Sequence, residues 1–255
     1  MSSDNRRQFL ARAAAFLVTH PIASMAQGES KPVEFKRIRL QADKLDPLAH
    51  FYQKTLGLEV AQRGGVLTVQ AGATVLEFTA AAEGRHPYYH FAFNIPENKL
   101  GDSMEWLRGR CPILQRPNGG GEIYHFANWN AHSCYFSDPA GNLLEFIARH
   151  TLRNESKRKF TQEDILSVSE IGLVSPEVPA VAEKLHSVFG VSSYMSGSAD
   201  FMPVGNEHGL FILVRNGRSW NIIDRPAEVF PVSISLKGGG AKQLKFSDAP
   251  YVVEG

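Results

Sequence analysis

The chain has 255 residues, of which 43% are hydrophobic, 21% are charged and 10% are aromatic, and its formal net charge is +1. This composition is typical of a globular protein and excludes a disordered or collagen-like chain. The near-neutral charge, with no clustered basic stripe, argues against a nucleic-acid-binding protein. No apolar run reaches the ~18 residues of a transmembrane helix. The two cysteines, Cys111 and Cys134, are too few for a four-cysteine zinc site, and their spacing does not establish a disulfide.

The first 26 residues have the order of an export signal. Two adjacent arginines, Arg6 and Arg7, precede a modestly apolar stretch at 11–18. The small residues Ser24 and Ala26 match the two positions that a signal peptidase reads. This segment resembles a twin-arginine signal, which bacteria use to export folded proteins. We therefore expect removal of 1–26 and a periplasmic protein without a membrane anchor. The alternative is an amphipathic N-terminal helix with a chance arginine pair.

The remaining chain repeats one arrangement of predicted strands and helices. Alternating apolar residues predict a half-buried strand in each of three segments, at 37–40, 90–93 and 170–173. A helical pattern follows each of them, at 45–56, 100–108 and 178–189. A later strand is predicted in each unit, at 74–78, 142–146 and 210–214. We therefore expect strand-helix-three-strand units at about 34–80 and 87–150, a third unit at about 165–215, and further strands at 231–237 and 244–253.

Alternation along these strands separates core positions from cavity positions. In a sheet with helices on one face, the apolar side chains face the helices. These apolar positions are Ile38, Leu40, Leu76, Phe78, Phe91, Phe93, Leu144 and Phe146. The opposite, concave face then receives Arg37, Arg39, Gln41, Glu77, His90, Asn94 and Glu145. Pairing of the first two units would bring their equivalent positions to one cavity, where a buried carboxylate pair needs a cation, a proton or a histidinium.

Three motifs, at 51–58, 89–93 and 135–145, follow one another in a familiar order. They resemble the vicinal oxygen chelate superfamily, which includes glyoxalase I, extradiol dioxygenases, epimerases and bleomycin-resistance proteins. The resemblance covers about 35–150 well and 165–237 weakly. It implies an α+β fold in which paired βαβββ modules form a concave mixed sheet with helices on the outer face. The expected organisation is an export signal at 1–26, paired modules at 34–150, and partial modules of the same type at 165–255.

The resemblance also implies a metal site. Metal-dependent members place ligands at the start of the first strand and the end of the fourth strand of each module, which here are Arg37, Glu77, His90 and Glu145. The last three are expected to bind one divalent iron, manganese, nickel or zinc ion, whereas a guanidinium has no free lone pair. An iron ring-cleaving site needs two histidines and one carboxylate, so Arg37 leaves one histidine missing. Glu170 is expected to contribute only if the third unit pairs across a homodimer.

The stretch before Glu145 is similar to that of extradiol dioxygenases. Tyr135 and an Asp-Pro-Ala-Gly turn at 138–141 precede the glutamate, and His125 lies upstream across a spacer about one residue too long. Cys134 stands where those enzymes have an aliphatic residue. The resemblance implies that Tyr135 hydrogen-bonds a substrate hydroxyl and that His125 assists proton transfer. The alternative is an ordinary hairpin turn and a packed strand tyrosine.

Two classes of function stay open. The first is a metal-dependent enzyme that acts on a small molecule with vicinal oxygens, with Arg37 and Arg39 binding the substrate. Within it, Tyr135 and His125 slightly favour catechol-type ring cleavage, whereas Glu77 favours a glyoxalase-type lyase or isomerase. The second class is a metal-free, bleomycin-resistance-like binding protein, in which Arg37 pairs with a glutamate at the metal position.

Overall fold

The computed structural model describes residues 33–220 and 222–255. The predicted export signal at 1–26 lies outside these residues and stays a prediction. In the described part, no helix is long and apolar enough to cross a membrane. Cys111 and Cys134 are both free.

The strands and helices follow the predicted repeat. The strands are β1 (Phe35–Ala42), β2 (Glu59–Arg63), β3 (Val66–Ala71), β4 (Thr74–Ala80), β5 (His90–Ile95), β6 (Tyr124–Phe126), β7 (Ala131–Ser137), β8 (Leu143–Arg149), β9 (Ser167–Ser175), β10 (Phe201–Asn206), β11 (Gly209–Arg215), β12 (Val232–Leu236), β13 (Gln243–Lys245) and β14 (Tyr251–Glu254). The α-helices are α1 (Leu45–His50), α2 (Leu100–Arg108) and α3 (Val178–Phe189). A π-helical turn, η1 (Phe51–Thr55), extends α1, and short 3-10 turns lie at η2 (Pro117–Gly119), η3 (Ala127–Trp129) and η4 (Gln162–Asp164).

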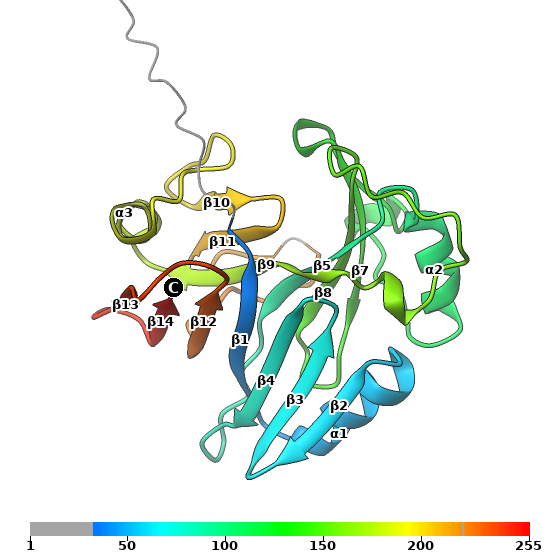
Figure 1. Ribbon diagram of the computed structural model, residues 1–255, viewed down its shortest axis with the longest axis horizontal. Coiled ribbons are helices and arrows are strands. Elements are labelled where there is room, and N and C mark those ends of the chain that lie inside the picture. Colours follow the sequence, from blue (N-terminus) through cyan, green and yellow to red (C-terminus); the bar gives the residue numbers. More distant parts are fainter. Residues whose placement is uncertain (1–32, 221) are drawn as a thin grey trace, which may run out of the picture.

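The described strands form two seven-stranded mixed sheets (Figure 1). One sheet has the order β13-β14-β12-β1-β4-β3-β2, and the other has the order β10-β11-β9-β5-β8-β7-β6. Within each sheet, two modules meet through antiparallel strands, β1 with β12 and β5 with β9. The predicted α+β class with paired modules is confirmed.

The choice of partner modules differs from the expectation. The first module (β1–β4) shares its sheet with the C-terminal strands β12–β14, and the second module (β5–β8) shares its sheet with the third (β9–β11). The expectation that the first two modules pair with each other is therefore wrong. Each module leaves one edge of its first strand open, and an open edge needs a partner strand. The segment 165–255 supplies that partner to both sheets, so it completes the fold rather than extending it.

The bounds of the helices show how the local sequence determines where each helix begins and ends. Helices α2 and α3 have the predicted bounds, and α3 ends at Gly190, whose φ of 73° is the left-handed conformation that terminates helices. The predicted helix at 45–56 is divided, because α1 continues as the π-helical turn η1. This turn ends before Gly57, which also has a positive φ of 67°.

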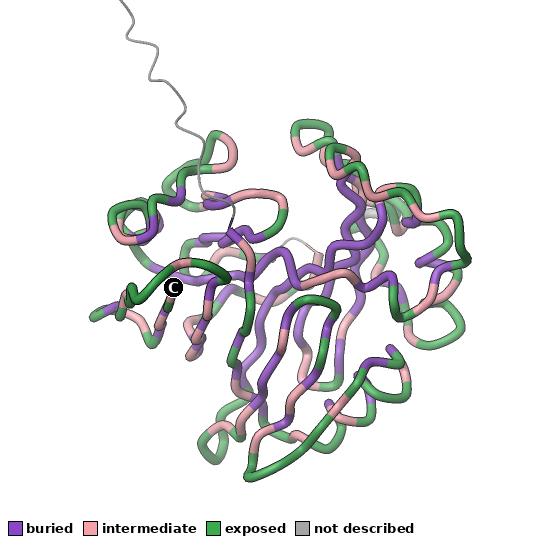
Figure 2. Tube along the Cα trace, viewed as in Figure 1, coloured by how far each residue is buried: buried purple, intermediate pink, exposed green. Residues whose placement is uncertain are grey.

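The predicted core positions are buried. Each of the eight apolar side chains expected to face the helices has a relative exposure of 0 or 1%: Ile38, Leu40, Leu76, Phe78, Phe91, Phe93, Leu144 and Phe146. Figure 2 shows that burial follows the central strands and that exposure concentrates in the connecting loops. The alternation of apolar residues along the strands therefore correctly predicts which side chains form the apolar core of both sheets.

Asp138 joins the first module to the second. Its Oδ2 accepts hydrogen bonds from the Tyr52 hydroxyl and from Asn142 Nδ2, both at 2.8 Å, and its Oδ1 accepts from the backbone N–H groups of Ala140 and Asn142. Burial raises the pKa of Asp138 to about 6. The turn at 138–141 is thus a hydrogen-bonded joint between η1 and the β7–β8 connection.

Tyr52→Phe is expected to lower the free energy of unfolding by about 1.5–3 kcal/mol at pH 8, since it removes one hydrogen bond to an ionised group. The loss should shrink at pH 5, where Asp138 is largely protonated. Urea denaturation at both pH values measures it. Tyr251→Phe is the matched control, because the Tyr251 hydroxyl bonds the neutral backbone of Val174 and its loss should not change with pH. Equal pH dependence of the two variants would contradict an ionised Asp138.

Candidate metal centre

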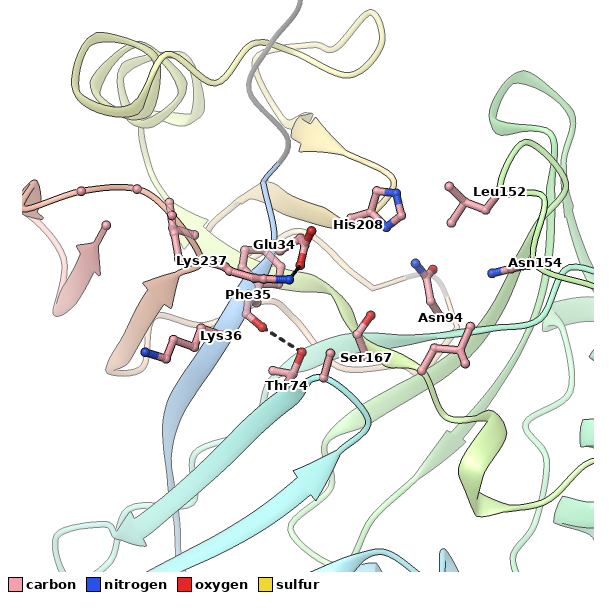
Figure 3. A pocket seen from close by; sticks show the side chains of 17 residues that line it. Glu34, Phe35, Lys36, Thr74, Asn94, Leu152, Asn154, Ser167, His208 and Lys237 are labelled. Carbon is pink, nitrogen blue, oxygen red and sulfur yellow. Dashed lines mark hydrogen bonds and ion pairs between the residues drawn. The ribbon is translucent and has the colours of Figure 1, made fainter.

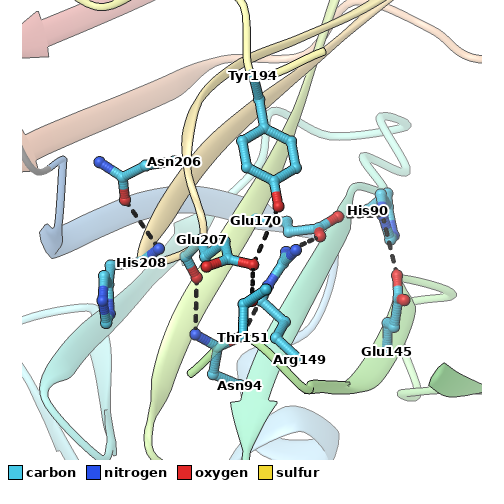
Figure 4. Close-up of polar contacts among 10 residues, drawn as sticks. All are labelled: His90, Asn94, Glu145, Arg149, Thr151, Glu170, Tyr194, Asn206, Glu207 and His208. Carbon is cyan, nitrogen blue, oxygen red and sulfur yellow. Dashed lines mark hydrogen bonds and ion pairs between the residues drawn. The ribbon is translucent and has the colours of Figure 1, made fainter. Parts of the chain in front are cut away.

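The second and third modules bring one histidine and two glutamates together (Figure 4). His90 begins β5, Glu145 lies on β8, and Glu170 lies on β9. Strand β5 runs between the other two, and Ala92 on β5 is the register partner of both Glu145 and Glu170. One ligand atom from each residue lies within 4.8 Å of the others, and the residues are 5%, 2% and 2% exposed. We call these three residues the His–Glu–Glu cluster.

The backbone fixes the orientation of His90. Its Nδ1 lies 3.1 Å from the carbonyl oxygen of Leu143, so Nδ1 carries a proton and donates it. Its Nε2 lies 3.7 Å from Glu145 Oε2 and 3.9 Å from Glu170 Oε2. Burial favours the neutral imidazole, but the two carboxylates outweigh it and raise the pKa of His90. Nε2 therefore faces two carboxylates, where it either binds a proton or ligates a cation. Metal-binding histidines have the same arrangement, in which the other ring nitrogen donates to a carbonyl.

The two glutamates differ in how well neighbouring positive groups compensate their negative charge. Burial, and then the charge of Glu170, raise the pKa of Glu145 to about 7. Its Oε1 is buried and has no hydrogen-bond partner among the described residues. Burial also opposes ionisation of Glu170, but Arg149 and His90 outweigh it, so the pKa of Glu170 is lowered. Glu145 is therefore the carboxylate that still needs a cation.

The donor set fits a divalent metal ion. One imidazole nitrogen and two carboxylate groups converge, and these ligand types suit zinc, manganese, iron or nickel. The unpaired Oε1 of Glu145 adds a ligand atom that the described protein residues do not satisfy. His90, Glu145 and Glu170 would hold the ion.

A polar chain leads from the cluster toward the surface (Figure 4). The buried Arg149 donates from Nη2 to Glu170 Oε1 and from Nε to Asn94 Oδ1, the latter at 3.2 Å. Asn94 Nδ2 donates to the backbone carbonyl of Glu207 at 2.8 Å, and the Tyr194 hydroxyl donates to Glu207 Oε1 at 3.0 Å. The chain connects the second module to the β10–β11 hairpin of the third.

Two aromatic residues border the cluster. Tyr135, on β7, is the register partner of Glu145 and lies 6.2 Å from His90 between ring centroids. Burial, and then the charge of Glu145, raise the pKa of Tyr135 well above its ordinary value. Trp220 lies 5.2 Å from His90, and a Cβ on Gly172 would come within 2.7 Å of the Trp220 ring. Glycine at 172 therefore allows Trp220 to lie over the histidine.

Glu77, predicted as the third metal ligand, lies in the other sheet. Arg37 Nε is 3.1 Å from its Oε1, and Arg39 Nη2 is 2.7 Å from its Oε2. Both arginine side chains are about half exposed, at 46% and 53%. The assignment of Glu77 to a site with His90 is thus corrected: their modules do not share a sheet, and two guanidinium groups neutralise Glu77. Arg37 and Arg39, predicted to bind substrate, pair with Glu77 and lie apart from the cluster.

His125, predicted to assist proton transfer, faces away from the cluster. Its register partner on β7 is His132, whose partner on β8 is Ala148, whereas Tyr135 pairs with Glu145. Because successive side chains point to opposite faces of a strand, His125 and His132 lie on the other side of the sheet. Their rings stack with centroids 4.4 Å apart. This prediction is therefore corrected.

Glu170 is the residue whose role the sequence reasoning placed wrongly. Its segment at 170–173 occupies the same position in the repeat as the segments that begin at Arg37 and His90. The expectation that it contributes only across a homodimer is corrected, because β9 pairs with β5 of the same chain. The equivalence of 170–173 with 90–93 is the sequence signal that points to this residue.

A separate cavity of about 740 Å³ lies between the sheets (Figure 3). Lys36, Thr74, Asn94, His208 and Lys237 are among the residues that line it. The residues of the His–Glu–Glu cluster do not line this cavity. It shares Asn94 with the polar chain that ends at Glu170.

Comparisons with known proteins agree with this architecture. Residues 34–146 match the family described as the Glyoxalase/Bleomycin resistance protein/Dioxygenase superfamily. The fold is similar to that of a candidate dioxygenase from Bacillus subtilis, at 17% identity over 81% of this chain and 71% of that chain, with a TM-score of 0.54. It is also similar to a glyoxalase I mutant from Zea mays, at 13% identity over 87% of this chain and 93% of that chain, with a TM-score of 0.53. A search of curated proteins gives no match. At these identities the solved structures establish the fold alone.

Proposed function

We propose that this chain, whose residues 34–146 match the glyoxalase/bleomycin resistance/dioxygenase superfamily, is a metal-dependent enzyme acting on a small molecule with two vicinal oxygens. The observation that carries the proposal is the buried cluster of His90, Glu145 and Glu170, in which one carboxylate oxygen has no partner among the described residues. A divalent ion held there supplies Lewis-acid polarisation of the substrate oxygens.

The residues at the cluster favour proton transfer over ring cleavage. A ring-cleaving iron site takes two histidines and one carboxylate, whereas this cluster has one histidine and two carboxylates, and His125 faces away. Glu170 is paired with Arg149, so Glu145 is the carboxylate of the two that would act as the general base. Glu145 would remove a proton from the carbon beside the substrate oxygens and return it to the neighbouring carbon. A glyoxalase-type lyase or isomerase is therefore the activity that we propose.

Ring cleavage remains the second candidate because of Tyr135. This tyrosine is 4% exposed and lies beside both Glu145 and His90. Its raised pKa keeps the hydroxyl protonated, so it would donate a hydrogen bond to a substrate oxygen.

Metal content tests the proposal. Chelator-treated protein reconstituted with manganese, iron, nickel or zinc should bind one equivalent of at least one of them. Glu145→Gln and His90→Gln should weaken that binding about 100-fold or more, since loss of a group that only supports a metal ligand already costs about 10–100-fold. The matched control is Glu77→Gln, at the equivalent position of the first module, which should retain full metal content.

The loaded protein then distinguishes the two activities. Methylglyoxal with glutathione tests the lyase, and catechol with measured oxygen uptake tests ring cleavage. Wild-type protein that binds none of the four metals stoichiometrically would contradict the proposal and favour a metal-free binding protein, in which Arg149 and a protonated His90 neutralise the two glutamates.

A further inference from the structure

Arg149 holds one unused donor beside the His–Glu–Glu cluster. Its side chain is fully buried, with 0% exposure. Nη2 donates to Glu170 and Nε donates to Asn94, but Nη1 is buried and has no hydrogen-bond partner among the described residues. Native proteins pair nearly all of their buried donors, so an unpaired guanidinium nitrogen indicates a partner that the protein itself does not supply.

Glu170 places this donor close to the proposed metal position. Its Oε1 accepts from Arg149, while its Oε2 faces His90 Nε2 at 3.9 Å. The guanidinium of Arg149 thus lies beside one oxygen of the Glu170 carboxylate, and the proposed metal position lies beside the other. A small molecule that chelates the metal therefore has Arg149 within reach.

The side chains that lie between Arg149 and the cluster on this face of the sheet are apolar. Ala92, Ala131 and Ile147 are completely buried and pack together, with Trp129 against them. Ile147 lies between Glu145 and Arg149 on the same face of β8, and Ala131 is the register partner of Arg149. The guanidinium carbon lies 5.7 Å from the centre of the Trp129 ring. A hydrocarbon ligand body that extends from the metal position to Arg149 would therefore contact apolar side chains.

The charges of the site also call for an anion. A divalent ion and Arg149 contribute three positive charges, and the two glutamates contribute two negative charges, so one positive charge remains when His90 is neutral. A buried uncompensated charge is costly unless a counter-charge meets it. A ligand with a carboxylate would supply that charge and accept a hydrogen bond from Nη1 in the geometry that guanidinium groups favour.

We propose that Arg149 Nη1 binds a carboxylate of the substrate, and that the substrate class is small organic acids whose vicinal oxygens bind the metal. This inference rests on the proposed function. It makes Arg149 a specificity-determining residue rather than only the counter-ion of Glu170.

Binding of matched acids and amides tests the inference without reference to turnover. Zinc-loaded protein is titrated by calorimetry with 2,3- and 3,4-dihydroxybenzoate, each compared with its neutral amide. For at least one isomer, the acid should bind about tenfold more tightly than the amide. In Arg149→Lys, which keeps a positive charge beside Glu170 but loses the guanidinium fork, this preference should fall below about threefold while one equivalent of zinc remains bound.

The outcomes separate the two proposals. Wild-type protein that binds zinc and both compounds equally would overturn the role of Arg149 and leave the metal site in place. Wild-type protein that binds none of zinc, manganese, iron and nickel would overturn the proposed function and the inference with it; if it binds one of the last three in place of zinc, the titrations use that metal. If Arg149→Lys does not fold, the comparison of acid with amide on the wild-type protein still decides the question.

Discussion

Glu170→Gln is expected to lower the free energy of unfolding of the metal-free protein by about 3–5 kcal/mol, the cost of leaving a buried charge unpaired. Arg149 is completely buried, and Glu170 is its ion-pair partner among the described residues. An amide cannot neutralise the guanidinium, and the rest of its polar environment, Asn94, is already neutral. Urea denaturation of chelator-treated protein at pH 8 measures the loss.

Glu145→Gln is the matched control, because it makes the same chemical change on the other side of β5. Burial and the charge of Glu170 both oppose ionisation of Glu145, so its removal should not destabilise the metal-free protein. The double variant Glu170→Gln with Arg149→Met should recover most of the stability lost by the first change, since no buried charge is then left unpaired. Equal losses for the two single glutamine variants would contradict this account.

The elements of the fold could be predicted because their signals are local. Helices α2 and α3 have the bounds that the apolar periodicity and the glycine at 190 indicate. The partner of each module could not be predicted in this way. The open edges of β1 and β5 are equivalent in the sequence, and strand alternation says which face is buried but not which strand lies alongside. The linker after β8 carries β9 back onto β5, and nothing in its composition indicates that return.

Two of the three residues of the His–Glu–Glu cluster can be predicted from the sequence, because the signals that place them are local. His90 and Glu145 share one module, so their convergence follows from the repeat. Glu77 occupies the same motif position as Glu145, yet Arg37 and Arg39 pair with it in a different sheet. The motif alone cannot distinguish a carboxylate that awaits a metal from one that two arginines already neutralise.

Register explains the other differences. His125 lies close to the dioxygenase spacing, but a shift of one residue along a strand moves a side chain to the opposite face. For Arg149, alternation along the strand gives the correct face, because it follows Glu145 and Ile147 on the concave face of β8. Its burial, however, depends on the third module. Its contact with Glu170 joins residues of different modules, which no local pattern reveals.

Metal affinity is expected to increase about 100-fold or more between pH 5 and pH 7 and to level off once the pH exceeds the pKa values of both Glu145 and His90. Below its raised pKa of about 7, Glu145 is protonated, so a metal ion must displace that proton, and each displaced proton changes the affinity tenfold per pH unit. The raised pKa of His90 adds a second displaced proton and makes the dependence steeper. Calorimetric titration with zinc in buffers of different ionisation enthalpy counts these protons directly.

The stability of the metal-free protein should change in the opposite direction over the same range. A carboxyl group whose pKa is higher in the folded state than in the unfolded state stabilises the fold at low pH, and this contribution is lost as the pH rises through about 7. Added zinc should therefore raise the unfolding midpoint most above pH 7 and least near pH 5. Glu77→Gln should show the same pH dependence as the wild-type protein. A zinc affinity that does not change between pH 5 and pH 7 would show that Glu145 and His90 do not ligate the ion.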